Sequence, residues 1–155
     1  MFAGKTVIIT GASSGLGRQM ARDFASRGAN CVLFGRNEER LTETLTLCER
    51  LGAEAITVTG DVSRPEDCER LVEVSVERFG GVDIYISNAG LSMWAPFDEI
   101  KDLSIFRRLI EVNYLGAVHG AHFALPYLKK NCGQFAAIVS IQSKVGVPYH
   151  TGYVA

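Results

Sequence analysis

The sequence has little proline and tryptophan and no excess of charge of either sign. Its 155 residues include 4 prolines and 1 tryptophan, and 16 Lys and Arg side chains balance 17 Asp and Glu, for a formal net charge of -1. Nonspecific nucleic-acid binding needs a concentrated positive field, which this balance does not supply. We therefore expect no nucleic-acid partner.

Long hydrophobic runs are also missing. No stretch approaches the roughly 20 consecutive apolar residues that span a bilayer, and the opening MFAGKTVIIT lacks the apolar stretch of a signal peptide. The four cysteines lie far apart, without a CxxC pair or a cluster with histidine, which argues against a zinc or redox site. We expect a cytoplasmic protein without a transmembrane segment or a metal.

Apolar, β-branched segments alternate with amphipathic ones along the whole chain. Strands that are apolar throughout and alternate with helices form a parallel sheet covered on both faces. The pattern therefore predicts one α/β domain over residues 1–155, with a doubly wound parallel sheet. Strands are predicted at 7–9, 31–35, 55–60, 82–87 and 135–141, and helices at 16–27, 38–51, 65–79 and 103–130.

Several helix ends carry their own signals. Asn37 is predicted to cap the second helix, and the S-x-x-E pattern that begins at Ser63 predicts a capping box for the third. Gly80 is expected to end that third helix. Residues 88–102 show no clean period and are expected to be irregular, and Pro126 predicts a kink in the last helix.

A glycine-rich turn, TGASSGLG from Thr10 to Gly17, joins the first predicted strand to the first helix. Glycine permits positive φ and a close approach of phosphate, and a helix N-terminus offers unpaired N–H groups. A plain tight turn is the alternative interpretation. Because the strand, turn and helix follow in the required order, phosphate binding is favoured.

The spacing G-x-x-x-G-x-G resembles the glycine motif of the short-chain dehydrogenase/reductase family. Further matches follow in order: Asp61-Val62 resembles the adenine contact of that family, SNAG at 87–90 is close to its N-N-A-G motif with Ser87 replacing the first Asn, Asn113 lies at the catalytic Asn, and Tyr153 opens its Y-x-x-x-K motif. The resemblance covers essentially the whole chain and implies a Rossmann-like fold.

The resemblance implies a nicotinamide dinucleotide cofactor at the carboxyl ends of the strands. Enzymes that prefer NAD usually have an acidic residue after the second strand, whereas this chain has Arg36, whose guanidinium suits the 2'-phosphate of NADP(H). NADP(H) is favoured, NAD(H) stays open, and a merely solvated arginine is the alternative. The cofactor residues expected are Gly11, Ser13, Ser14, Gly15, Leu16, Gly17, Arg36, Asp61, Val62, Asn88, Ala89 and Gly90.

The resemblance also implies three catalytic residues. Tyr153 would donate its phenolic proton to the substrate oxygen, Ser140 would hold that oxygen by a hydrogen bond, and Asn113 would support a proton relay through water. In the family the serine lies about thirteen positions before the tyrosine, which selects Ser140; Ser143 would require a shortened loop. A satisfied hydroxyl at Ser140 and a backbone-bonded Asn113 are the structural alternatives.

The function implied is hydride transfer between NADP(H) and a carbonyl or alcohol substrate, as in a carbonyl reductase. The loop around Ser92, Met93 and Trp94 is apolar and aromatic, which suits a hydrophobic small molecule. The resemblance further implies a homo-oligomer, dimer or tetramer, for the parent protein.

The family places a lysine four residues after the tyrosine to lower the pKa of the phenol, and that position would be 157. The chain ends at 155. We therefore expect a chain truncated after Tyr153, without the C-terminal part of the sheet and the substrate lid and with little turnover of its own. A non-catalytic dinucleotide-binding module is the alternative function.

Overall fold

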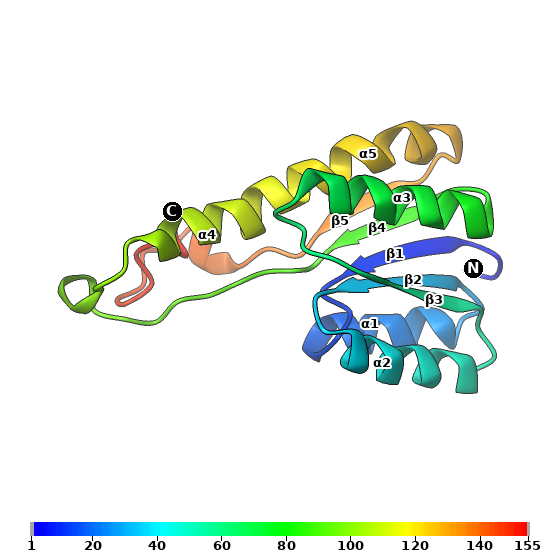
Figure 1. The fold of residues 1–155 in the computed structure, drawn as a ribbon, viewed down its shortest axis with the longest axis horizontal. Coiled ribbons are helices and arrows are strands. Elements are labelled where there is room, and N and C mark those ends of the chain that lie inside the picture. Colours follow the sequence, from blue (N-terminus) through cyan, green and yellow to red (C-terminus); the bar gives the residue numbers. More distant parts are fainter. Residues whose placement is uncertain (1, 155) are drawn as a thin grey trace.

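Five parallel strands form one sheet in the order β3-β2-β1-β4-β5 in the computed structural model, which describes residues 2–154 (Figure 1). This order places the first strand at the centre. The chain adds β2 and β3 on one side of β1 and then crosses to add β4 and β5 on the other side, so the strand order reverses between β1 and β4. This is the doubly wound, Rossmann-like topology that the alternation of segments predicts. The strands are β1 Thr6–Thr10, β2 Asn30–Gly35, β3 Ala55–Thr59, β4 Ile84–Ser87 and β5 Gln134–Ala137.

Helices cover both faces of the sheet (Figure 1). Helices α1 (Gly15–Ala25) and α2 (Glu38–Arg50) lie on one face, and α3 (Pro65–Phe79) and α5 (Gly116–Lys130) lie on the other. Helix α4 (Ser104–Ile110) continues the line of α5 beyond the sheet, where the C-terminal segment lies beside it. Among residues 2–154, no helix has the length and hydropathy needed to cross a membrane.

The central strand explains why the core has two halves. Successive side chains of a strand point to opposite faces, so Ile8 packs with the cluster under α3 and α5, whereas Val7 and Ile9 pack with the cluster under α1 and α2. All three side chains are fully buried. The strand is covered on both faces, and its three central residues are all apolar, as its sequence predicts; the polar threonines lie at its ends.

Two of the predicted helix ends are confirmed and one is wrong. The Asn37 side chain accepts a hydrogen bond from the Arg40 N–H at 2.9 Å, and Gly80 ends α3 in the left-handed conformation at φ 80°. The capping box at Ser63 does not form, because Arg64 occupies the N-cap position of α3. Instead, Ser63 donates its backbone N–H and its hydroxyl to the carboxylate of Asp61.

The last third of the chain departs most from the sequence pattern. The predicted helix over 103–130 is divided by a π-helical turn at Glu111–Leu115, while Pro126 lies inside α5. The predicted strand over 135–141 ends at Ala137, and all four residues of β5 are exposed. The apolar sequence predicted a buried strand; β5 is instead at the edge of the sheet, with β4 as its one neighbour among the described residues.

Candidate nucleotide-binding and catalytic site

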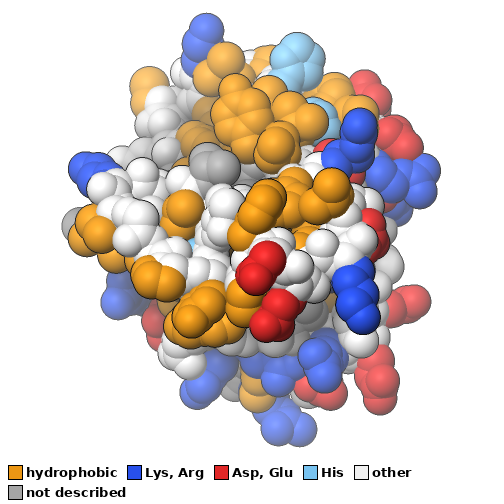
Figure 2. Space-filling model, turned by 90° about the vertical axis from the view of Figure 1, so that its left-hand side faces the viewer, with side chains coloured by type: hydrophobic (Ala, Val, Ile, Leu, Met, Phe, Trp, Pro, Cys, Tyr) orange, Lys and Arg blue, Asp and Glu red, His pale blue; other side chains and the backbone are white. Residues whose placement is uncertain are grey.

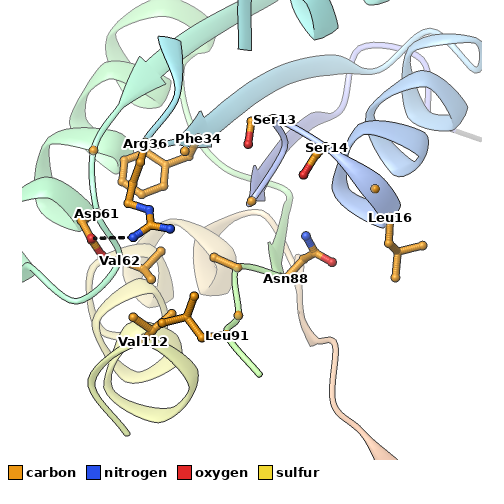
Figure 3. A pocket seen from close by; sticks show the side chains of 16 residues that line it. Ser13, Ser14, Leu16, Phe34, Arg36, Asp61, Val62, Asn88, Leu91 and Val112 are labelled. Carbon is orange, nitrogen blue, oxygen red and sulfur yellow. Dashed lines mark ion pairs between the residues drawn. The ribbon is translucent and has the colours of Figure 1, made fainter. Parts of the chain in front are cut away.

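A cavity of about 320 Å³ lies at the carboxyl ends of the first four strands. Figure 3 shows Ser13 and Ser14 on one side of it, Arg36 and Asp61 on another, and Leu91 with Val112 opposite. Eleven of the twelve residues predicted to bind the cofactor line this cavity, and the twelfth, Gly17, lies directly behind the turn. The cavity is lined by Gly11, Ser13, Ser14, Gly15, Leu16, Phe34, Gly35, Arg36, Gly60, Asp61, Val62, Asn88, Ala89, Gly90, Leu91 and Val112.

The three glycines of the turn are needed for different reasons. Gly11 and Gly15 have φ of 68° and 53°, a region that favours glycine. Gly17 has no room for a side chain, because a Cβ there would clash with the Gly11 carbonyl oxygen and lie 2.7 Å from the Asn88 amide nitrogen. The backbone can therefore approach a ligand closely along the whole turn.

The N-terminus of α1 faces this turn without a side-chain cap. Ser14 occupies the N-cap position, but its side chain makes no capping hydrogen bond, and the first turn of α1 carries no acidic residue. The first N–H groups of a helix lack intrahelical partners and carry the positive end of its dipole. This arrangement suits an anion such as a phosphate group.

The Thr10 side chain connects the glycine turn to the strand on the other side of the cavity. Its hydroxyl oxygen accepts the N–H groups of Asn88 and Ala89 at 2.9 and 3.0 Å, and the Asn88 side chain donates to the Thr10 carbonyl at 2.9 Å. Thr10 is 1% exposed. The segment that carries the SNAG sequence is thus held against the end of β1.

Charged side chains form the rim of the cavity beside the ends of β2 and β3. Arg36 lies 3.8 Å from the Asp61 carboxylate (dashed line in Figure 3), and its side chain is 53% exposed. The Asp61 backbone N–H donates to Asp67 of α3 at 3.0 Å. Burial opposes ionisation of Asp67, but this hydrogen bond and the nearby Arg70 and Arg64 hold its pKa below the ordinary value.

Helix α5 supports the Val62 wall of the cavity. A ring nitrogen of His119 lies 3.0 Å from the Val62 carbonyl oxygen, within hydrogen-bonding distance, and a Cβ at Gly116 would clash with the Val62 side chain. Within residues 2–154, no three His, Cys, Asp or Glu side chains gather as a metal site would require.

A second cavity of about 520 Å³ adjoins the first. Residues 88–91 line both cavities, so the SNAG segment forms their common wall. The structure brings the predicted catalytic residues together here, although they come from three separate segments. The lining residues are Ser87, Asn88, Ala89, Gly90, Leu91, Ser92, Asn113, Tyr114, Ala117, Ala137, Ile138, Val139, Ser140, Ser143 and Tyr153.

The hydrogen bonds of these residues show what each side chain already contacts. The Asn113 carboxamide bonds to both backbone groups of Leu91, accepting its N–H at 2.7 Å and donating to its carbonyl at 2.9 Å. The Ser140 hydroxyl accepts the Gln142 N–H, and the Ser143 hydroxyl donates to the Ser140 carbonyl. Both serines line the cavity, but a hydroxyl has one proton to donate. That of Ser143 is donated to the Ser140 carbonyl, whereas Ser140 acts as an acceptor toward Gln142 and keeps its proton for a substrate oxygen.

Three apolar residues that line the first cavity were missed from the sequence: Phe34, Leu91 and Val112. Phe34 is adjacent to Gly35 at the end of β2, and Leu91 follows the SNAG segment. Their positions next to recognised residues were the available signal. Val112 had no such signal, because its place depends on how the α4–α5 region packs against the sheet.

A sheet in this order, with a glycine turn and an uncapped helix at the carboxyl end of its central strand, defines a Rossmann-like protein of the nucleotide-binding class. Comparison with known sequences then gives the family. The chain belongs to the short-chain dehydrogenase family, a family of oxidoreductases, whose model matches residues 5–155.

The relatives found include hydroxysteroid dehydrogenases of plants. The chain is 39% identical over 153 residues to an 11-beta-hydroxysteroid dehydrogenase-like 4A of Arabidopsis thaliana, covering 98% of this chain and 51% of the relative. It is 37% identical over 154 residues to an 11-beta-hydroxysteroid dehydrogenase A of Sesamum indicum, covering 99% and 44%. The chain thus spans about half the length of the curated relatives it matches.

Solved structures agree with the fold. An alcohol dehydrogenase from the archaeon Thermococcus sibiricus, complexed with 5-hydroxy-NADP, superposes with a TM-score of 0.92 at 35% identity, covering 97% of this chain and 64% of that one. A putative short-chain alcohol dehydrogenase from Sinorhizobium meliloti 1021 also gives a TM-score of 0.92, at 30% identity, covering 99% and 61%.

Proposed function

We propose that residues 1–155 bind NADP(H) in the first cavity and belong to an enzyme that reduces a carbonyl compound or oxidises the corresponding alcohol. The observation that carries the proposal is the glycine turn, where Gly11, Gly15 and Gly17 bring bare backbone and the α1 N-terminus to the cavity. These residues fit a phosphate group, because glycines leave the backbone of the turn bare. Gly17 in particular cannot take a side chain, since its Cβ would fill the space that the close-packed backbone needs.

Arg36 supports a preference for the 2'-phosphate. Its guanidinium lies at the rim, half exposed, with the Asp61 carboxylate as its one ion-pair partner among the described residues, at 3.8 Å. A phosphate presents more charge than a carboxylate and accepts paired hydrogen bonds from the guanidinium fork. The solved relative with 5-hydroxy-NADP supports the same assignment.

In the second cavity, the residues would act on the substrate. Bound NADP(H) supplies the hydride chemistry. Tyr153 would transfer a proton to or from the substrate oxygen, and the Ser140 hydroxyl would hold that oxygen and stabilise developing charge. Ser143 could take this part only by giving up its hydrogen bond to the Ser140 carbonyl. Asn113 would fix the Leu91 wall through its two hydrogen bonds, whereas its part in a proton relay stays a prediction.

We infer a hydrophobic substrate from the apolar side chains in and around the second cavity. Leu91, Ile138 and Val139 line the second cavity, and hydrophobic side chains gather on the surface that faces the viewer in Figure 2. Nearby in the sequence, Trp94 and Phe97 are 71% and 62% exposed. The hydroxysteroid dehydrogenases among the relatives support a substrate of this class.

Titration calorimetry with NADP⁺ and NAD⁺ tests the cofactor proposal. Arg36→Asp should weaken NADP⁺ binding at least tenfold more than NAD⁺ binding, because it replaces an attraction for the 2'-phosphate by a repulsion. Arg22→Asp makes the same change of charge on an exposed residue of α1 and should affect neither ligand. Equal losses for both ligands would overturn the role of Arg36, and no binding of either would overturn the nucleotide site.

The homo-oligomer implied by the resemblance stays a proposal. Large apolar side chains are exposed at intervals of four where α4 continues into α5, at Ile110 of α4, Tyr114 of the π-helical turn and Val118 of α5. Residues four apart lie on one helix face, and such a face suits packing against a second copy. Tyr114→Glu should lower the mass measured by light scattering in solution if this face is the contact.

A further inference from the structure

Two side chains outside the cavity hold the back of the glycine turn. The hydroxyl of Thr44, which is fully buried in α2, lies 3.0 Å from the carbonyl oxygen of Ala12 and also 3.0 Å from that of Arg40, so the two oxygens share its one proton. The guanidinium of Arg18 in α1 donates to the carbonyl oxygen of Ser13 at 2.8 Å. Two consecutive carbonyl groups of the turn are thus bonded by residues that do not line the cavity, whereas Ser13 and Ser14 do line it.

The two side chains are also bonded to each other. Arg18 donates from Nε to the Thr44 hydroxyl at 3.1 Å, and its terminal nitrogen donates to the Glu43 carboxylate at 2.8 Å. A guanidinium held at several of its donors has little rotational freedom. The Arg18–Thr44 pair therefore joins the turn to α2, the helix that begins just after Arg36.

The direction of these carbonyls fixes the direction of two N–H groups. In a planar trans peptide the C=O of one residue and the N–H of the next point in opposite directions, and none of the described peptides is cis. Because the Ala12 and Ser13 carbonyls point to the Arg18–Thr44 pair, the N–H groups of Ser13 and Ser14 must point away from it. Both N–H groups belong to residues of the cavity wall.

We propose that Arg18 and Thr44 are positioning residues for the dinucleotide, which orient the Ser13 and Ser14 N–H groups for the phosphates of the ligand. This inference rests on the proposed nucleotide site. It assigns a task to α2, the helix that begins just after Arg36: this helix would hold the turn in its binding conformation before the ligand arrives. Preorganised donors lower the cost of ordering that binding must otherwise meet.

Thr44→Val is the direct test, because it removes the hydroxyl and keeps the shape of the side chain. Calorimetry should show NADP⁺ and NAD⁺ binding weakened by the same factor, roughly five- to tenfold. Adenosine, which carries no phosphate, should bind unchanged in an NMR titration. Thr44→Ser restores the hydroxyl and should return the affinities to within about twofold of the original. Thr42→Val, on the exposed face of α2, is the matched control and should change nothing.

Hydrogen exchange gives a readout that needs no ligand. The amides of residues 13–17 should exchange faster in Thr44→Val than in Thr42→Val, while those of β1 keep their rates. Unchanged exchange, or unchanged affinity for NADP⁺ in a variant that still folds, would overturn the positioning role. Loss of adenosine binding by a similar factor would also overturn it, because the effect would then be a general loss of structure.

Arg18→Met keeps the test valid if Thr44→Val does not fold. The Arg18 side chain is 29% exposed, so its replacement is better tolerated than a change in the buried core. It should speed the exchange of amides 13–17 and weaken both dinucleotides, with Arg22→Met on the same helix as the control. If the unaltered chain binds no dinucleotide, the nucleotide site itself is wrong, whereas the exchange experiment still reports separately on the Arg18–Thr44 pair.

Discussion

The two cavities are built in different ways, although they share the wall at 88–91. The first cavity is made of strand ends and turns supported by buried side chains, such as Thr10 and Thr44. The second is lined by segments whose own apolar side chains are in part exposed, with Val139 at 81% and all of β5 open to solvent. A site set in a packed core resists movement, whereas one on exposed segments depends on few contacts.

The two regions should differ most in how much stability they lose when a glycine is replaced by alanine. Gly17→Ala should destabilise the fold by about 2–3 kcal/mol, because its Cβ would collide with the Gly11 carbonyl oxygen and the Asn88 amide. Gly146→Ala, where a Cβ meets nothing within 4 Å, should stay within about 0.5 kcal/mol. Urea denaturation measures both changes in the free energy of unfolding, and equal losses for the two variants would contradict the expected difference between the regions.

A substitution next to the charged rim of the first cavity should change the free energy of unfolding by a smaller amount, and that amount should depend on pH. Asp67→Asn should cost about 1–2 kcal/mol at pH 7, since the carboxylate receives the Asp61 N–H and an Arg70 hydrogen bond. The folded pKa of Asp67 lies below its ordinary value. Its contribution is therefore present above the unfolded pKa and is lost as pH falls through the folded one.

Denaturation at a series of pH values tests this sign. The difference between the Asp67→Asn variant and the original chain should narrow below about pH 4. Glu69→Gln, on the exposed side of α3, should show no comparable gap at pH 7. A gap for Asp67→Asn that stays constant down to pH 2 would contradict the ionic origin of the contribution.

The core beneath both cavities contains one polar group that should be dispensable. The Tyr85 hydroxyl is buried and has no hydrogen-bond partner among residues 2–154, and burial raises the pKa of this phenol. Tyr85→Phe should leave stability unchanged or raise it by up to about 1 kcal/mol, because it removes an unpaired polar atom. A loss of more than about 1 kcal/mol in thermal denaturation would show that the hydroxyl has a partner.

The smallest effect is expected beside the second cavity. Ile141 is 80% exposed, so Ile141→Ser should change the free energy of unfolding by less than about 0.5 kcal/mol. The same measurement sharpens the comparison of the two regions. A loss above about 1 kcal/mol would mean that residues 138–145 are packed in solution.

Much of the first cavity could be predicted because its residues follow buried strands. The positive φ at Gly11 and Gly15 and the cap at Asn37 are local properties, and short sequence patterns encode them. The order of strands also brings Asp61 and Asn88 to the same edge of the sheet. Their roles toward the cofactor remain predictions, but their positions around one cavity follow from the topology.

The errors arose where a competing contact, local or distant, outweighs the pattern of the segment. Ser63 lost the N-cap position because the Asp61 carboxylate binds both its N–H and its hydroxyl. The π-helical turn contains Asn113, whose carboxamide is bonded to Leu91, 22 residues away, a constraint that helical periodicity does not record. In β5, apolar composition indicated burial, but burial depends on which elements pack on an edge strand, and no single segment contains that information.

The Thr10 hydroxyl bonds imply an order of assembly. They join residues 78 and 79 positions apart, and closing so long a loop requires the sheet to pair β1 with β4. The bond between Arg18 and Thr44 spans only 26 positions. During synthesis, therefore, the turn can be held by α2 well before the opposite wall exists, and the cavity is complete only after its last lining residue, Val112, has left the ribosome.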